Sequence, residues 1–333
     1  VANMSVLGCD LATELCGRGP LEAASRGIPL GPDDICFRFN LVSVAADGRL
    51  LDFSGGHIAQ EDAEEAVRLL NAALGTDRIR FYSGVSYRNL LVLSGAGFSA
   101  AVCCAKPDDN MGNPVAEHLP CATTPAGEAT AALLRDLMAR AAVVLKGRTA
   151  NGIWPWSGGQ AGALRRLDER YGIRAAVISA VDVINGLGRC MGMDIIRVDG
   201  ATGYIDTNYE GKADAAIEAI RDYDFVYVHV EAIDEVSHAR DVELKLRAIE
   251  DFDRRLVARV IGNVDPATTF VVLPDHPVPL ATGRHTRNPV PVAVRRPGVA
   301  PDGVQTFDEI ACRQGALGEL RGSALMDLLF ARH

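Results

Sequence analysis

RAAVISAVDVINGLGRCMGMDIIRV, residues 174–198, reads as a strand, a helix and a second strand in direct succession. Arg174 to Ser179 is a short apolar run, VDVINGLGRCMGM has helical character, and Asp194 to Val198 is again strand-like. Two strands joined by a crossover helix form a βαβ unit, in which the strands run parallel. This stretch therefore predicts an α/β fold built on a parallel sheet.

The same alternation continues toward the C-terminus. GATGYIDTNYEGKADAAIEAI, residues 200–220, predicts a helix with Asp206 or Thr207 as its N-cap. A third strand is expected over Asp224 to Val230 and a fourth over Thr269 to Leu273. The helix between them has one apolar stripe at helical spacing, made of Val242, Leu246, Ile249, Phe252, Leu256 and Val260. Strands that alternate with helices imply a mostly parallel sheet flanked by helices.

The first half of the chain has a different sequence pattern, without the regular alternation of strands and helices. It combines strand-like segments, one helix and loops rich in glycine, proline and aspartate. The expected strands are Ile35 to Val44, Arg78 to Tyr82 and Asn89 to Ser94, and the expected helix is Gln60 to Leu74. We therefore predict a smaller inserted α+β domain over residues 29–128, with residues 1–28 and 129–333 forming the main core.

The segment Ile153 to Trp156 follows the expected inserted domain. It is apolar and strand-like, and we expect it to bring the chain back toward the main sheet. Its two tryptophans, Trp154 and Trp156, flank a proline and are expected to be core residues.

Composition excludes several classes of protein. The 333 residues are 48% hydrophobic and 23% charged, as in an ordinary globular protein and unlike a disordered chain. The formal net charge of −9 opposes binding to nucleic acid. No apolar run approaches the roughly 20 residues that cross a bilayer, and no signal-like segment opens the chain, so we expect a cytoplasmic protein without a membrane partner.

Cysteine usage agrees with that location. The eight cysteines are scattered and contain no CxxC pair, which favours reduced thiols over disulfides. They are Cys9, Cys16, Cys36, Cys103, Cys104, Cys121, Cys190 and Cys312.

Polar side chains with metal-binding chemistry follow two of the expected strands. Asp234 and His238 come after the third strand, at a spacing that puts both on one side of a helical turn. Asp275 and His276 come directly after the fourth strand, and His285 lies nine residues further on. Ligands of parallel α/β sheets bind beyond the carboxyl ends of the strands, so these side chains are expected to converge.

Imidazole and carboxylate together suit Zn, Mn or Fe, whereas carboxylates alone favour Mg or Ca. Five ligands exceed one tetrahedral zinc and can fill most of two adjacent sites, an arrangement that clamps a transferring phosphoryl group. The alternative is structural: Asp234 caps a helix, Asp275 and His276 are turn residues, and His285 is a surface histidine.

Arginines provide candidate anion-binding groups. Arg18, Arg38 and Arg88 can clamp a phosphate or carboxylate, because the guanidinium fork matches those groups. Each can equally be a solvated or structural arginine. GRGP, residues 17–20, reads as a turn into a helix with Pro20 at the first helical position, and it can hold an anion or serve only as a turn.

Long motifs distributed over nearly the whole chain resemble one known family. They are SVLGCD, GRGPLEAASRGI, FRFNLV, SYRNLLVL, ISAVDVINGLG, GATGYIDTNYEGKA, VHVEAIDEVSH, AIEDFDRRLV, PDHPVP, RHTRNPVPV and RGSALMDLL. The chain resembles the archaeal-type 2,3-bisphosphoglycerate-independent phosphoglycerate mutases of the alkaline phosphatase superfamily. The resemblance implies a phosphatase-like α/β core, interrupted by a smaller domain that closes over the substrate.

The resemblance also implies two divalent metal ions, with manganese as the first choice and zinc or magnesium as alternatives. Asp234, His238 and His285 would hold one ion, and Asp275 and His276 the other. The family also carries a metal-binding aspartate in a DG motif and a seryl nucleophile just before the stretch that matches Val1 to Ser5. We expect both upstream of Val1, because the sequence starts without methionine and reads as the middle of an element.

The activity implied by the resemblance is an isomerisation in glycolysis, the interconversion of 2- and 3-phosphoglycerate through a phosphoserine. Arg38 and Arg88 of the inserted domain would hold the carboxylate or phosphate of this small phosphorylated acid. The chain departs from the family motifs at Asp108, Asn185 and Arg240, which stand near the expected site. Two alternatives therefore stay open: a phosphatase or phosphotransferase acting on another phosphorylated or phosphonate acid, and a catalytically silent binding protein.

Overall fold

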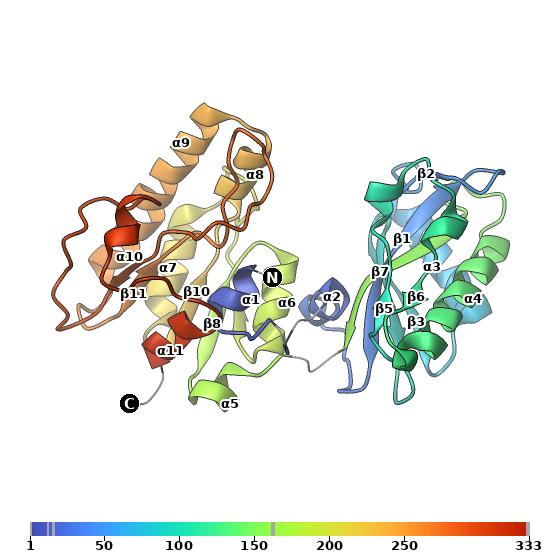
Figure 1. Cartoon of the computed structure of the whole chain (residues 1–333), viewed down its shortest axis with the longest axis horizontal. Coiled ribbons are helices and arrows are strands. Elements are labelled where there is room, and N and C mark those ends of the chain that lie inside the picture. Colours follow the sequence, from blue (N-terminus) through green and yellow to red (C-terminus); the bar gives the residue numbers. More distant parts are fainter. Residues whose placement is uncertain (1, 12, 15–16, 161–163, 331–333) are drawn as a thin grey trace. The chain divides into compact units, whose positions relative to one another are not determined.

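The computed structural model describes the chain except for residues 1, 12, 15–16, 161–163 and 331–333. It divides the chain into two compact units (Figure 1). Unit 1 comprises Val1–Leu15 and Arg165–His333, and unit 2 comprises Cys16–Leu164. No helix among the described residues is both long and apolar enough to cross a membrane.

The parallel sheet of unit 1 has three strands in the order β10-β8-β9. They are β8 (Ala175–Ile178), β9 (Asp194–Ile196) and β10 (Phe225–Val228). Helix α6 (Asp182–Cys190) connects β8 to β9, and α7 (Tyr209–Ala219) connects β9 to β10. The predicted βαβ unit is thus confirmed, and so is the α/β class.

Further helices complete unit 1. They are α1 (Ala2–Val6), α5 (Leu167–Tyr171), α8 (Ala232–His238), α9 (Val242–Asp251), the π-helical turn η4 (Phe252–Val257), α10 (Ala258–Asn263), η5 (Ala311–Gln314) and α11 (Ala324–Phe330). Beside the sheet, Ile178, Tyr209 and Leu256 lie in one buried apolar cluster, which joins α7 and η4 to β8. Burial of this cluster, more than helix propensity, stabilises these elements.

The sheet is smaller than the sequence predicts. The expected fourth strand, β11 (Phe270–Val272), pairs antiparallel with β12 (Ala293–Arg295) in a separate two-stranded sheet. All three residues of β11 are only half-buried, and Pro274 and Pro277 follow it closely. Because proline has no amide hydrogen, the segment after β11 cannot extend a regular ladder.

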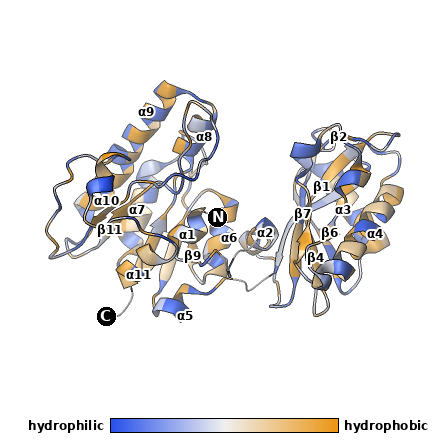
Figure 2. Ribbon diagram, viewed as in Figure 1, coloured by the Kyte–Doolittle hydropathy of each residue, from blue (hydrophilic) through white to orange (hydrophobic). Residues whose placement is uncertain are grey.

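Two details of the predicted helices differ in the structure. The N-cap of α7 is Asn208, whose Oδ1 accepts a hydrogen bond from the Gly211 amide at 2.8 Å, and not Asp206 or Thr207. The helical stripe over residues 242–260 is confirmed as helix, but only its C-terminal part is buried. Val242, Leu246 and Ile249 are 56%, 59% and 44% exposed, and Figure 2 shows hydrophobic and hydrophilic residues alternating along α9.

Unit 2 is built on a five-stranded antiparallel sheet. Its strands are β1 (Ile35–Val44), β2 (Leu50–Asp52), β3 (Ile79–Val85), β4 (Arg88–Leu93) and β7 (Gly152–Gln160). The central strand, β1, pairs with β4 and with β7, and Arg38 lies opposite both Leu90 and Trp156. A separate pair, β5 (Val102–Cys103) and β6 (Cys121–Ala122), forms a small second sheet.

Helices α3 (Gln60–Leu74) and α4 (Glu128–Val144) contribute to the core of unit 2. Helix α2 (Arg18–Ser25) also belongs to this unit, as do the short turns η1 (Pro107–Asn110), η2 (Val115–His118) and η3 (Pro125–Gly127). The helix expected over Gln60 to Leu74 and the strand expected over Ile35 to Val44 are confirmed at both ends.

The compact units differ from the expected domain ranges at residues 16–28 and 129–164, which both lie in unit 2. Strand β7 joins this antiparallel sheet instead of returning the chain to the parallel one, since its residues pair with β1 over most of its length. Trp154 and Trp156 are buried there, as expected of core residues. Their indole nitrogens donate to Ala105 O at 2.8 Å and to Asn40 Oδ1 at 2.9 Å.

Candidate metal centre

Helix α8 carries the first two predicted ligands. Asp234 and His238 lie one turn apart on it, and His238 Nε2 is 3.2 Å from Asp234 Oδ2. The predicted helical turn is therefore confirmed, and it places the Asp234 and His238 side chains on the same side of the helix. Asp234 is not the N-cap of this helix, because that position belongs to Glu231.

The other three predicted ligands come from the loop that follows β11. This loop lies along α8 and the start of α9 through three hydrogen bonds. They join His238 Nδ1 to Gly283 O at 2.9 Å, Arg240 Nε to Leu280 O at 3.0 Å, and Lys245 Nζ to Val278 O at 3.1 Å. Asp275, His276 and His285 therefore reach α8 although β11 is not part of the parallel sheet.

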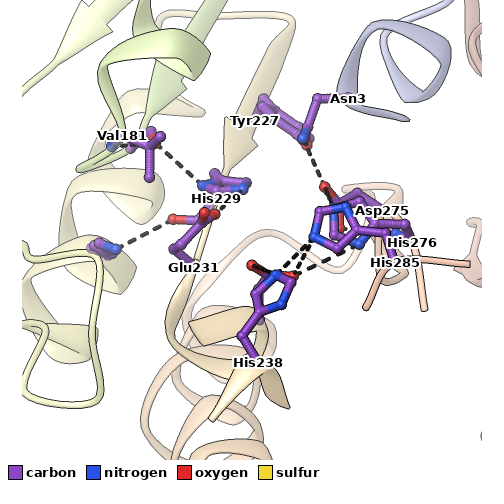
Figure 3. A network of polar contacts seen from close by, with 12 residues as sticks. Asn3, Val181, Tyr227, His229, Glu231, His238, Asp275, His276 and His285 are labelled. Carbon is purple, nitrogen blue, oxygen red and sulfur yellow. Dashed lines mark hydrogen bonds and ion pairs between the residues drawn. The ribbon is translucent and has the colours of Figure 1, made fainter. Parts of the chain in front are cut away.

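All five predicted ligands converge (Figure 3 labels His238, Asp275, His276 and His285). His238 Nε2 lies 2.8 Å from His285 Nε2, which in turn is 3.4 Å from Asp234 Oδ1. His276 Nδ1 is 3.8 Å from the same aspartate oxygen, and its ring stacks on that of His285 at 3.9 Å. His276 Nε2 is 3.2 Å from Asp275 Oδ2.

The donor set fits divalent cations. Asp234, His238 and His285 each offer a ligand atom within 4.8 Å of the other two. Asp234 Oδ1 and His276 Nδ1 are buried and have no hydrogen-bond partner among the described residues. An unsatisfied buried polar atom costs roughly 1–3 kcal/mol, and cations bound by these side chains would remove that penalty. The mixed imidazole and carboxylate set suits Mn, Zn or Fe.

Burial and the neighbouring His276 and His238 lower the pKa of His285. The neutral imidazole, which is the form that ligates metals, is therefore favoured in this cluster.

Buried ionisable groups that the sequence analysis did not single out adjoin the five ligands. His229 is 8% exposed, and its Nδ1 and Nε2 lie 3.3 Å from Ser179 Oγ and from Glu231 Oε2 (Figure 3). Burial lowers the pKa of His229 to about 4, and burial together with Asp234 and Asp275 raises the pKa of Glu231 to about 7. Both residues stand in the motif VHVEAIDEVSH, so their position just before the ligands was a usable signal.

The three predicted anion-binding arginines lie in unit 2, around Glu22 of α2. Arg38 is nearly buried, with Nε 3.1 Å from Glu22 Oε1 and its guanidinium 4.4 Å from the ring centre of Trp156. Arg18 and Arg88 are exposed. Burial is the largest cause that lowers the pKa of Arg38, and the positive charges of Arg18 and Arg88 lower it further. The three cations therefore share one neighbourhood in this unit.

An α/β unit with converging imidazoles and carboxylates defines the chain as a candidate metal-binding α/β protein. Residues 1–151 match the family model of 2,3-bisphosphoglycerate-independent phosphoglycerate mutase. The chain is 43% identical to the protein of that name from Methanosarcina acetivorans, over 99% of this chain and 85% of that protein. The 2,3-bisphosphoglycerate-independent phosphoglycerate mutase 2 of Methanothermobacter thermautotrophicus is 44% identical, over 99% of this chain and 83% of that protein. The chain belongs to the archaeal-type 2,3-bisphosphoglycerate-independent phosphoglycerate mutase family.

A solved structure shares the fold. The cofactor-independent phosphoglycerate mutase of Thermoplasma acidophilum superposes with a TM-score of 0.67 at 27% identity, over 98% of this chain and 84% of that one.

Proposed function

We propose that this chain catalyses the metal-dependent interconversion of 2- and 3-phosphoglycerate, an isomerisation of glycolysis, in the cytoplasm. The observation that carries the proposal is the convergence of five imidazole and carboxylate side chains from α8 and the loop after β11. The names of the relatives give the reaction. No disulfide joins any two of the seven cysteines that the structure describes, which supports a reducing compartment; Cys16 lies outside the described residues.

The five ligands would bind two divalent ions, Asp234, His238 and His285 one of them and Asp275 and His276 the other. When bound, such a pair neutralises charge on a transferring phosphoryl group and stabilises the entering and leaving oxygens. Manganese is our first choice, with zinc or magnesium as alternatives. Because Asp234 Oδ1 approaches both His285 and His276, its carboxylate would keep the two halves of the centre at a fixed spacing.

Unit 2 would supply the groups that bind the substrate. Arg18, Arg38 and Arg88 offer guanidinium donors to its carboxylate or phosphate. The ion pair with Glu22 and the stacking on Trp156 hold Arg38 in one orientation, so little side-chain entropy would be lost when an anion binds. A seryl nucleophile, which the family resemblance implies, would accept the phosphoryl group and return it to the substrate.

The test is a phosphorus NMR assay of the protein, expressed with whatever residues precede Val1 naturally. With Mn²⁺ and 3-phosphoglycerate, the 2-phosphoglycerate signal should grow to equilibrium without release of inorganic phosphate. His238→Ala and Asp275→Ala should each remove about one bound ion and abolish turnover, because each removes one ligand of a different ion.

His118→Ala is the matched control, since His118 belongs to unit 2, at the end of η2. It should retain both ions and full activity. Phosphate release without isomerisation would replace the mutase with a phosphatase, and absence of both products would indicate a binding protein. Unchanged metal content in His238→Ala and Asp275→Ala would overturn the two-ion centre itself.

A further inference from the structure

A chain of two hydrogen bonds runs from the parallel sheet to Asp275. Asn3 of α1 donates from Nδ2 to Asp275 Oδ2 at 2.7 Å. Its Oδ1 accepts a hydrogen bond from the hydroxyl of Tyr227, a residue of β10. Figure 3 shows Asn3 lying between Tyr227 and Asp275. Three segments more than 40 residues apart in sequence therefore meet at this carboxylate.

The orientation of the Asn3 amide follows from its two partners. A carboxylate accepts hydrogen bonds only, so the amide nitrogen must face Asp275, and the amide oxygen then faces the Tyr227 hydroxyl. Burial and the charges of Asp275 and Glu231 raise the pKa of Tyr227, which keeps this hydroxyl protonated as a donor. Tyr227 itself is held by the parallel ladder, opposite Val177 of β8.

Asp275 is fixed on its other oxygen as well. Its Oδ1 accepts a hydrogen bond from the His276 amide at 2.9 Å, while Asn3 holds Oδ2. A carboxylate that accepts a hydrogen bond at each oxygen is restrained against rotation about its Cβ–Cγ bond. Hydrogen-bonding partners of metal ligands orient those ligands and change metal affinity in the same way.

We propose that Asn3 and Tyr227 are positioning residues that hold Asp275 in the orientation needed to bind the second ion. This inference rests on the two-ion centre of the proposed function. It adds a role for α1, which contributes none of the five ligands, and for a tyrosine whose position in a strand looks purely structural. Neither residue is one of the five predicted ligands.

A merely structural role would tie α1 to the sheet, and α1 has other contacts for that purpose. Met4 of α1 and Leu7, which follows α1, are 2% and 1% exposed, and Cys9 Sγ donates to Met191 Sδ at 3.8 Å. Loss of the Asn3 amide leaves this apolar packing in place. The two roles therefore predict different results when only the polar groups are removed.

The experiment titrates the protein, expressed with whatever residues precede Val1 naturally, with Mn²⁺ and counts free Mn²⁺ by its electron paramagnetic resonance signal. His238→Ala and Asp275→Ala first identify which of the two bound ions depends on which ligands. Asn3→Ala should then weaken the Asp275-dependent ion by about 10–100-fold and leave the other ion unchanged. Tyr227→Phe, which keeps the ring and loses only the hydroxyl, should weaken the same ion by a smaller factor.

Two matched variants control for general effects. Tyr223→Phe removes a hydroxyl that donates to Asp194 at 2.9 Å, and Asn263→Ala removes an amide that donates to Arg259 O at 2.8 Å. Both should bind the two ions as the wild type does. If Asn3→Ala fails to fold, Tyr227→Phe still decides the question, because its aromatic packing beside Phe225 and His229 is retained.

Three results would contradict the proposal. If Asn3→Ala and Tyr227→Phe bind both ions with wild-type affinity, the two residues do not position Asp275. If they weaken both ions equally, their role is structural. If the wild type itself binds fewer than two Mn²⁺ ions, the two-ion centre fails, and that failure is visible before any positioning variant is measured.

Discussion

At the scale of single residues, burial decides the chemistry of the ionisable groups that surround the five ligands. Lys212 of α7 is the clearest example, because its side chain is 1% exposed and its ammonium donates to His229 O at 3.3 Å. Burial lowers its pKa to about 8, and Glu231 is the charged group that opposes this shift. A lysine held in this way is charged at neutral pH at a cost in stability.

Lys212→Met should remove that cost at neutral pH. Between pH 8 and roughly 10.4 the unfolded wild type binds more protons than the folded one, so its free energy of unfolding rises with pH relative to the variant. The difference in the free energy of unfolding between the wild type and Lys212→Met should change by on the order of 3 kcal/mol over this range. Urea unfolding of both proteins by circular dichroism at pH 7 and pH 10.5 measures it, and a pH-independent difference would show that Lys212 titrates normally.

At the scale of elements, a glycine in α2 lets its backbone approach the sheet of unit 2. Helix α2 begins at Arg18, so Pro20 of the GRGP motif is its third residue and not its first. A methyl group on Gly19 would lie 2.2 Å from the backbone oxygen of Cys36 in β1. The structure thus accounts for this glycine by helix–sheet packing, which neither interpretation of the GRGP motif, an anion site or a simple turn, had predicted.

Gly19→Ala should therefore destabilise unit 2 although alanine is the better helix former. The clash involves backbone on both sides and should outweigh the roughly 1 kcal/mol that alanine gains in a helix. Gly262→Ala in α10 is the matched helical control, since nothing lies within 4 Å of its added methyl group. It should stabilise the protein by about 0.4–1 kcal/mol. Thermal unfolding of the two variants compares them, and equal shifts of the same sign would refute the packing argument.

At the scale of the whole molecule, each unit has a hydrophobic core of its own. Leu134 is fully buried in the main cluster of unit 2, and Leu256 is 4% exposed in the cluster of unit 1. Both tryptophans, Trp154 and Trp156, belong to unit 2, whereas the five predicted metal ligands belong to unit 1. Tryptophan fluorescence and Mn²⁺ binding therefore report on different units.

Leu134→Ala should cost about 2–5 kcal/mol of core packing and lower the midpoint of the fluorescence-detected transition by roughly 5–20 °C. Mn²⁺ binding should be unaffected at temperatures where unit 1 is folded. Leu256→Ala should destabilise unit 1 instead. The variant should lose Mn²⁺ at a lower temperature, while the midpoint of the fluorescence-detected transition stays unchanged. Loss of Mn²⁺ affinity in Leu134→Ala at 25 °C would show that the two cores are not energetically separate.

Local patterns were sufficient for much of this protein. The apolar pattern predicted both ends of α3 and of β1 correctly. The i,i+4 spacing of Asp234 and His238 predicted that both lie on one helical turn. Long family motifs were sufficient to identify the family to which the chain belongs. These features depend on side-chain types within a few residues of one another, or on residues that a motif holds at fixed intervals.

Tertiary structure alone decided which strands pair and what surrounds the ligands. Strand β7 pairs with β1, and β11 pairs with β12, because hydrogen-bond partners and burial depend on contacts between distant segments. The meeting of Asn3, Tyr227 and Asp275 spans 272 residues and leaves no local pattern. The sequence by itself determined the family, the helical turn and the candidate ligand residues, whereas only the folded chain determined how those side chains are held, since the orientation of a side chain is set by neighbours that the chain brings together in space.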